Sequence, residues 1–309
     1  MYQEVLKMEK NKSRRHSLSD IVIAVLLYLF LAVAGLACVL PMWHVLMGSL
    51  SETMKFGTYE GFLLFPIAGK FTFESYTYLF THQYLWRSIA NAVIYTVSSV
   101  ALGLIMSIMA AYALTRKNVL FKRPLMIIIL ITMFFNGGMI PFFMVVNQLG
   151  MVDTPWALII PTCCNAMNIV MLRTGIQAIP DAIFEAAELD GAGPLRILFR
   201  IVVPLTTSFI VVIILFNGVA QWNSWANASM FISTSRQDLY PLQLVLRDLL
   251  MSSVSDMGLK IPSGSGSSEV YAPGIRMAGV IIASLPLIII YPFLQKHFEK
   301  GMIIGSVKG

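Results

Sequence analysis

The chain alternates between long apolar runs and short polar segments, and the lengths of the apolar runs indicate its fold class. A helix needs about 20 mostly apolar residues to cross the hydrocarbon core of a bilayer. Because a lipid-facing segment must satisfy its own backbone hydrogen bonds, each run is expected to be helical. The pattern therefore predicts an all-α integral membrane protein with six transmembrane helices. The runs are residues 21–42, 89–113, 125–146, 155–173, 203–222 and 276–294.

The composition agrees with a chain that is covered largely by lipid. Of its 309 residues, 57% are hydrophobic and 12% are charged, and the mean hydropathy is +0.75. A soluble domain carries about 25% charged residues, so this chain has too little charge for a fully hydrated surface. The net charge of +6 does not indicate a nucleic-acid partner, because the cationic residues cluster beside apolar runs.

Neither a metal site nor a disulfide framework is predicted. The three cysteines, Cys38, Cys163 and Cys164, all lie within apolar runs. Two adjacent cysteines on a helix cannot both face one ligand. The four histidines are scattered and no H-E-x-x-H motif occurs, which disfavours a membrane-embedded metalloenzyme.

The first apolar run has the layout of a secretory signal, because it follows a basic stretch. Gly35-Leu36-Ala37-Cys38 also resembles part of a lipoprotein cleavage site. However, Gly35 stands where a larger aliphatic residue is expected, and the apolar run continues to Leu46. We therefore interpret residues 21–42 as the first span rather than as a cleaved leader.

The distribution of Lys and Arg predicts the orientation. Fifteen of the 22 Lys and Arg residues lie in segments that a six-span chain places on one side, namely 1–20, 114–124, 173–202 and 295–309. The turn at 147–154, on the other side, has none. Because cytoplasmic loops carry an excess of Lys and Arg, both termini are expected in the cytoplasm. The predicted domains are a cytoplasmic arm at 1–20, a six-span region at 21–294 and a cytoplasmic tail at 295–309.

Two segments are expected on the outer side. Residues 49–88 are rich in aromatic side chains. They are typical of an interfacial aromatic belt, and the alternative is a surface that receives a delivery protein. The run 262–268, Pro-Ser-Gly-Ser-Gly-Ser-Ser, predicts a loop tip.

Residues 180–204 form the most elaborate polar segment between two apolar runs. Pro180 and Asp181 predict the start of a short helix, because an acidic side chain favours the positive end of a helix. Gly191 predicts a sharp turn that a residue with a β-carbon would resist. A second helical stretch at about 195–202 is expected to lead back to the membrane. The residues of the pattern are Glu185, Ala186, Ala187, Asp190, Gly191, Ala192, Phe199, Ile201 and Pro204.

This spacing, in the loop before the penultimate apolar run, resembles the EAA loop of ABC-importer permeases. From about residue 70 onward the chain is similar to carbohydrate-uptake permeases of the maltose-permease type, in the branch for oligosaccharides and uronate-containing polysaccharide fragments. The resemblance implies a permease core at about 87–294, with a coupling loop at 174–203. The similar segments are Asn136–Pro141, Thr154–Pro161, Trp222–Trp225, Leu239–Gln243 and Gly301–Gly309.

The resemblance implies the type I ABC importer permease fold in a bacterial inner (cytoplasmic) membrane. It also implies partners: a second permease that forms a heterodimer with this chain, two cytoplasmic ATPase subunits and an extracytoplasmic solute-binding protein. The helix around 185–191 is expected to sit in an ATPase groove, with Glu185 beside a basic residue. ATP binding by the ATPases would then drive alternating access.

The chain itself is not expected to be an enzyme. It has no G-x-x-x-x-G-K-[ST] phosphate loop, so no catalytic residue and no cofactor is assigned to it. ATP and Mg²⁺ are expected on the partner ATPases.

Polar and aromatic side chains within the spans are candidates for the solute path. Amides donate and accept hydrogen bonds and so suit sugar hydroxyls, and tryptophan rings can stack on the apolar faces of sugars. The alternative is that the amides join helices and the tryptophans anchor the chain at an interface. Asn136-Gly137-Gly138, followed by Pro141, also predicts an irregular third span. The candidates are Asn136, Asn165, Asn168, Asn217, Gln221, Trp222, Asn223 and Trp225.

Two other transport functions remain open. The span interiors hold no Asp, Glu or Lys, which disfavours a proton-coupled symporter but leaves sodium sites built from carbonyl groups possible. An ABC permease for a peptide or an amino acid is the closer alternative, because the EAA loop occurs across ABC importers.

Overall fold

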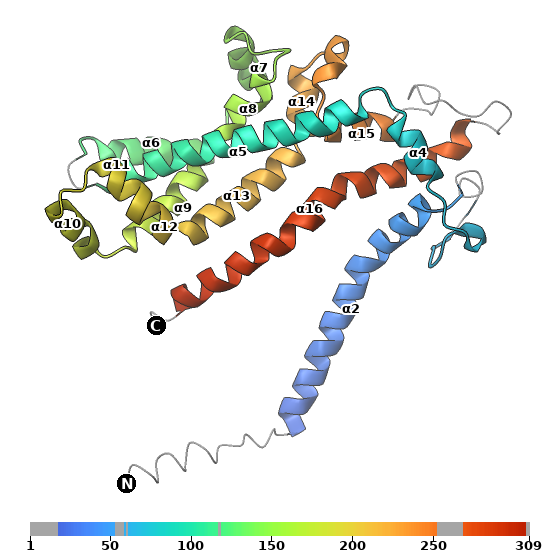
Figure 1. The fold of residues 1–309 in the computed structure, drawn as a ribbon, viewed down its shortest axis with the longest axis horizontal. Helices are drawn as coiled ribbons and strands as arrows, with labels where there is room; N and C mark the ends of the chain where they lie inside the picture. The colour runs from blue at the N-terminus through green and yellow to red at the C-terminus, as the bar shows by residue number, and fades with distance from the viewer. Residues whose placement is uncertain (1–17, 53–58, 60, 117–118, 252–267, 307–309) are drawn as a thin grey trace.

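The computed structural model describes residues 18–52, 59, 61–116, 119–251 and 268–306. The predicted N-terminal arm lies outside the described residues apart from 18–20, and so does the loop tip apart from Ser268. Of the predicted tail, residues 307–309 also lie outside. Within the described part, the regular structure is entirely helical (Figure 1). The all-α prediction is therefore confirmed for that part of the chain.

The helices follow one another with short connections. The α-helices are α2 (Leu18–Ser49), α4 (Glu74–Phe80), α5 (Leu85–Thr115), α6 (Lys122–Phe134), α7 (Met139–Gln148), α8 (Trp156–Cys163), α9 (Ala166–Gln177), α10 (Asp181–Leu189), α11 (Pro194–Ile197), α12 (Val203–Leu205), α13 (Thr207–Trp222), α14 (Trp225–Phe231), α15 (Leu242–Met251) and α16 (Ser268–Ser306). Three short elements complete the order: the 3₁₀ turns η1 (Ile67–Gly69) and η3 (Thr234–Leu239) and the π-helical η2 (Leu198–Val202).

The candidate membrane spans fall into two kinds. Among the described residues, Ser19–Ser49, Leu85–Thr115 and Pro273–Pro292 are long and apolar enough to cross a bilayer as single helices. Three further candidates are bent pairs: α6 with α7, α8 with α9, and Pro194–Leu205 with α13. Each predicted run therefore contains helix, but the runs at 125–146, 155–173 and 203–222 are not the continuous straight helices that the apolar pattern suggested.

The sharpest bend, 120° between α6 and α7, lies where the sequence predicts an irregularity. Gly138 has φ +88°, a conformation that is unfavourable for residues with a β-carbon. The side-chain oxygen of Asn136 accepts a hydrogen bond from the Gly138 N–H at 3.0 Å. The glycine conformation and this local bond end α6 and start α7, so the predicted irregularity is confirmed.

The other two bends have local causes as well. Between α8 and α9 the helices meet at 43°, where Pro161 lacks the N–H that would continue the hydrogen-bond ladder. Asn165 then caps α9, because its side chain accepts the N–H of Met167 at 2.9 Å. The third bend, 77°, falls at Thr206, whose hydroxyl donates back to the carbonyl of Val202 at 2.7 Å.

The long helix α5 is the element against which most of the bundle packs, with α8, α9, α13 and α15 beside it (Figure 1). One of its faces carries buried small residues at intervals of four or seven, which lets neighbouring backbones approach closely. At Gly103 the approach is so close that a β-carbon would overlap the carbonyl oxygen of Cys163. The small residues are Ser88, Ala92, Ser99, Gly103, Ser107 and Ala111.

Buried side chains form two main clusters, one toward each end of the bundle. The α14–α15 cluster includes Leu79, Phe231 and Leu242. The α10–α11 cluster includes Leu172, Ile197 and Val202, and Phe184 and Ala187 of α10 pack against it. The second cluster therefore ties the predicted coupling loop to the helices that reach into the apolar region.

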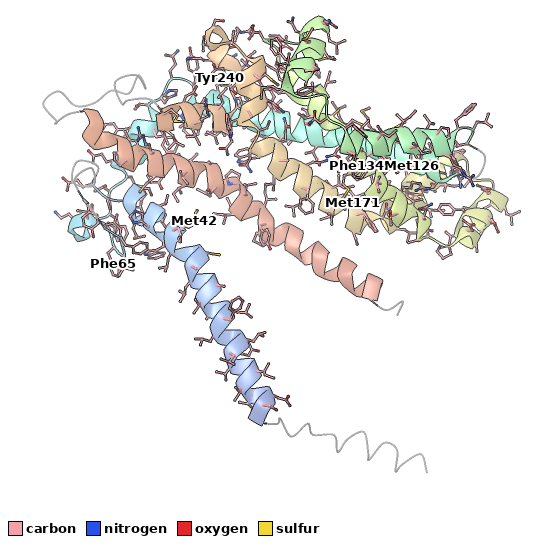
Figure 2. The ribbon with its side chains drawn as sticks, turned by 180° about the vertical axis from the view of Figure 1, so that it is seen from behind. Met42, Phe65, Met126, Phe134, Met171 and Tyr240 are labelled. Carbon is pink, nitrogen blue, oxygen red and sulfur yellow. The ribbon has the colours of Figure 1, made fainter. Side chains whose placement is uncertain are left out.

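The first helix, α2, diverges from the rest of the bundle. It packs against α16, and Met47, near its C-terminal end, is buried. Figure 2 shows its other side chains extending away from the bundle along most of its length, and none of its apolar stretch is buried. Its apolar side chains are therefore left to be covered by lipid or by another chain.

Candidate functional site

The helix α10 begins and ends where the sequence predicts. Pro180 precedes it in an extended conformation, and Asp181 lies in its first turn. At its C-terminal end, Gly191 has φ +75°. The Gly191 N–H donates to the carbonyl of Glu188 at 3.0 Å, and the Ala192 N–H donates to that of Ala187 at 2.9 Å. This pair of bonds is the Schellman arrangement, which requires a left-handed residue at the position of Gly191.

The two sides of α10 differ in what they contact. Phe184 and Ala187 face the α10–α11 cluster, whereas Glu185 and Ala186 are exposed. Leu189 is 89% exposed, although it is a large apolar side chain. Figure 1 shows α10 projecting at one end of the molecule. An exposed helix face with an acidic residue, an alanine and a leucine is suited to enter a groove on another protein.

An arginine from another part of the chain holds α10 in place. Nη2 of Arg116, which directly follows α5, lies 2.8 Å from Oε1 of Glu188. The same guanidinium carbon lies 5.0 Å from the ring centroid of Tyr112 and 5.5 Å from that of Phe184, which is within the range of cation–π attraction. Arg116 therefore connects the end of α5 to α10 through charge and through two aromatic faces.

The sequence did not reveal this connection. Arg116 counted there only as one of the cations that set the orientation, and Glu188 was not part of the pattern. The two residues are 72 positions apart, and no local periodicity relates them. Only the packing of α5 against α9, which leads into α10, brings them together.

The second half of the loop returns to the bundle as α11, η2 and α12. The predicted helical stretch at about 195–202 is confirmed, although its last five residues form a wider π-helical turn. Ile197, Leu198 and Val202 are buried in the α10–α11 cluster. Asp190, Phe199 and Pro204 are exposed, while Ala192 and Ile201 are partly buried. The pattern residues thus divide into an outward-facing set and a set that anchors the loop.

Most of the predicted path residues make hydrogen bonds within the helix bundle. Nε2 of Gln221 donates to the carbonyl of Leu158 at 2.9 Å, and Nε1 of Trp222 donates to that of Ala283 at 3.1 Å. Nδ2 of Asn223 donates to the carbonyl of Val219 at 2.9 Å. Asn136 and Asn165 serve at the helix breaks described above. Asn168 is buried and Asn217 is partly buried. The structure therefore distributes the candidates over several helix contacts rather than gathering them in one cavity.

Asn223 and Trp225 are the exception, because both line one recess. Its volume is about 540 Å³, and it lies between the end of α13, the start of α14, α15 and α16. Gln243, Arg247 and Arg276 also line it. The guanidinium carbon of Arg247 lies 4.5 Å from the ring centroid of Trp225. The sequence did not single out Arg247, because α15 is short and amphipathic and lies outside the predicted spans.

A second contact joins two turns near this end of the molecule. The Asp153 N–H donates to the carbonyl of Phe231 at 2.9 Å, and Oδ1 of Asp153 accepts the Ser233 N–H at 2.6 Å. Hydrogen bonds from Ser233 stabilise the carboxylate and lower the pKa of Asp153 below its usual value. Asp153 also has φ +60°, which aspartate tolerates better than most residues.

The comparison with protein families decides to which group this arrangement belongs. The family described as the inner membrane component of binding-protein-dependent transport systems matches residues 102–304. The chain belongs to this family. The match covers α10, Gly191 and the recess, so both candidate sites lie within the part that defines the family.

Several relatives of this permease are known. It is 38% identical over 284 residues to the polygalacturonan/rhamnogalacturonan transport system permease protein YtcP of Bacillus subtilis, covering 92% of this chain and 97% of that protein. It is 35% identical over 283 residues to protein LplC of the same organism, covering 91% and 93%.

The fold of the permease also matches a solved structure. A chain from a bacterial ABC transporter involved in the import of the acidic polysaccharide alginate superposes with a TM-score of 0.79 at 29% identity, covering 91% of this chain and 98% of that one. The predicted resemblance to carbohydrate-uptake ABC permeases is thereby confirmed.

Proposed function

We propose that this chain is the transmembrane permease subunit of an ATP-driven ABC importer that carries a carbohydrate, in particular an oligosaccharide, delivered by an extracytoplasmic binding protein. The observation that carries the proposal is the α10 geometry: an exposed helix closed by the left-handed Gly191, within a chain of the binding-protein-dependent family. The relatives named for polygalacturonan/rhamnogalacturonan and for alginate transport support a carbohydrate cargo.

The proposed topology has six spans, with both termini in the cytoplasm of a bacterium and the spans in its inner membrane. Each bent pair would count as one span, as its combined length and apolar composition allow. In Figure 1, α10, α11 and the C-terminal end of α16 lie toward the same side of the view, and α4 lies toward the other. This arrangement supports a cytoplasmic coupling loop and a cytoplasmic C-terminus on the same side.

The coupling surface would be the exposed face of α10. Glu185 and Leu189 are positioned to enter a groove of the ATPase, with Glu185 opposite a basic residue. In this proposal the ATPase binds ATP and Mg²⁺, and this chain supplies no catalytic group. The complete importer would contain a second permease and two ATPase subunits. Movement of an ATPase would reach α5 through Arg116 and through the α10–α11 cluster.

The solute path would pass the recess that Asn223 and Trp225 line. The hydrogen bonds of Gln221 and Trp222 to backbone carbonyl groups favour a role for these two residues in joining helices. We assign the same role to Asn165, Asn168 and Asn217, which lie at a helix break or within helix contacts.

The proposal is tested by reconstituting this chain with its second permease, ATPases and binding protein in proteoliposomes. We expect uptake of an oligosaccharide that depends on ATP, and uptake should fall when Glu185 is changed to Ala or Gly191 to Val. ATP hydrolysis that is indifferent to both changes would contradict the coupling role of α10.

A thermal-shift screen of the binding protein identifies the class of cargo. Stabilisation by glycans is the expected result. Stabilisation by amino acids or peptides, with no response to glycans, would replace the carbohydrate by one of those solutes.

A further inference from the structure

We propose that the recess between α13, α14, α15 and α16 binds a sugar residue that carries a carboxylate, so that the cargo is an acidic rather than a neutral oligosaccharide. This inference rests on the proposed import function and adds the charge class of the cargo to it. Three features of the recess carry the inference: its two arginines, the arrangement of Arg247 on Trp225, and its uncharged amides.

The charge of the lining favours an anion. Arg247 and Arg276 both line the recess, and among the described residues no Asp or Glu side chain does. Asp248 lies next to Arg247, with its carboxylate oxygen 3.5 Å from Nη1, but it lines a different recess, beside Phe143 and Tyr240. A neutral sugar gains nothing from two guanidinium groups, whereas a carboxylate gains a charge-assisted hydrogen bond from either one.

Arg247 is held in a position suited to this task. Its guanidinium carbon stacks 4.5 Å from the centroid of the Trp225 ring, and the planar group keeps its N–H donors directed outward from its edges. A stacked guanidinium loses less conformational entropy on binding than a free lysine side chain, and its paired donors match the two oxygens of a carboxylate.

The remaining lining suits the rest of a sugar. Trp225 is 42% exposed, so part of its ring remains available for an apolar sugar face. Asn223 and Gln243 provide amides for hydroxyl groups. The volume of about 540 Å³ lies within the ~300–1,000 Å³ that small-molecule sites usually have. One recess therefore combines a carboxylate partner, a ring surface and hydroxyl partners.

The experiment measures binding to the assembled complex of two permeases and two ATPases in nanodiscs, without the binding protein, so that only the membrane part selects. The probes are the trisaccharides of galacturonate and of mannuronate, each compared with its neutral methyl ester. The variants are Arg247→Gln, Arg247→Lys and the control Arg236→Gln. Arg236 is exposed, bonds to Asp238 in η3 and does not line the recess.

We expect the complex to bind at least one acidic trisaccharide about tenfold more tightly than its ester, as one charge-assisted contact implies. Arg247→Gln should abolish this preference, Arg247→Lys should retain part of it, and Arg236→Gln should leave it intact. The preference should also weaken as salt is raised.

The contrary outcomes separate the two levels of the proposal. Equal binding of acid and ester, or an acid preference that survives Arg247→Gln, would overturn the acidic subsite and leave carbohydrate import standing. Binding of none of the four probes would count against both. The headgroup of an anionic lipid is the other source of a negative charge. If phosphatidylglycerol in the nanodisc displaces no sugar but quenches Trp225 in an Arg247-dependent manner, the recess is a lipid site and the inference is wrong.

Discussion

The side chains of Arg116 and Glu188 meet at 2.8 Å between Nη2 and Oε1, although 72 residues separate them in the sequence. Arg116 follows directly on α5, and Glu188 lies on the third turn of α10. Because the Arg116 side chain is 25% exposed and that of Glu188 is 55% exposed, water screens the pair and its contribution is modest. Its importance is positional: it fixes where α10 stands relative to the longest helix of the bundle.

We therefore expect Glu188→Gln to reduce transport per ATP hydrolysed by about two- to fivefold, which corresponds to the ~0.4–1 kcal/mol of a partly exposed ion pair. The exchange Arg116→Glu with Glu188→Arg should recover part of the loss. Arg196→Gln, an exposed charge change in the same loop, is the control. Equal uptake-to-hydrolysis ratios in wild type and Glu188→Gln would show that the pair does not transmit motion.

The turn after α10 should depend on backbone conformation alone. At Gly191 an added β-carbon meets nothing within 4 Å, but φ is +75°. Gly191→Val is expected to cost about 1–2 kcal/mol of local stability and to reduce ATPase co-purification, whereas Gly191→Asn should be tolerated better. Gly193→Ala, at φ −70° and also in open space, is the matched control. If both valine and asparagine variants retain the ATPase at wild-type levels, the left-handed turn is not needed for docking.

The contact between α5 and α8 should be sensitive to a single methyl group. Gly103→Ala places a β-carbon on the carbonyl oxygen of Cys163, so the helices must separate. We expect a loss of about 1–3 kcal/mol, seen as a lower Tm of the purified complex. Gly218→Ala, where nothing lies within 4 Å, should be neutral or stabilising. A Tm for Gly103→Ala equal to that of Gly218→Ala would contradict the close approach.

The bridge at Asp153 predicts a pH dependence. The pKa of Asp153 is lowered in the folded protein, chiefly by the hydrogen bond from the Ser233 N–H. Its stabilising contribution is therefore fully present above the unfolded value of about 3.8 and is lost as pH falls through the lower, folded value. Asp153→Asn tolerates the same backbone conformation. The Tm difference between wild type and this variant should be small at pH 7, favour the wild type, and vanish below about pH 3. A difference that grows on acidification would have the wrong sign.

Local features of the fold could be predicted from the sequence, and relations between distant segments could not. Pro180, Asp181 and Gly191 define α10 through rules that act within a few residues, and Gly137-Gly138 marks the sharpest bend in the same way. The bend at Thr206 escaped prediction, because the residues around it are as apolar as the helix that follows. Apolar composition alone does not reveal where a helix changes direction.

The two candidate sites differ in the same respect. The docking face of α10 is contiguous in sequence, so its residues could be named in advance. The recess takes its lining from four helices, and only Asn223 and Trp225 were anticipated. Arg247 lies on α15 and meets Trp225 through tertiary packing. Trp222, three residues before Trp225, turns instead toward Ala283, since residues at that spacing need not share a face once the helix ends between them.

The isolation of α2 gives its apolar side chains an unusual freedom to change. A substitution inside the α14–α15 cluster must be matched by its neighbours, whereas between about 21 and 40 most side chains of α2 have no neighbour in their own chain. Thermal unfolding of the isolated chain should hardly register exchanges there among Leu, Ile, Val and Phe. Related permeases can therefore diverge in this helix, and adjust which lipid or subunit lies against it, while the bundle that moves the solute stays as it is.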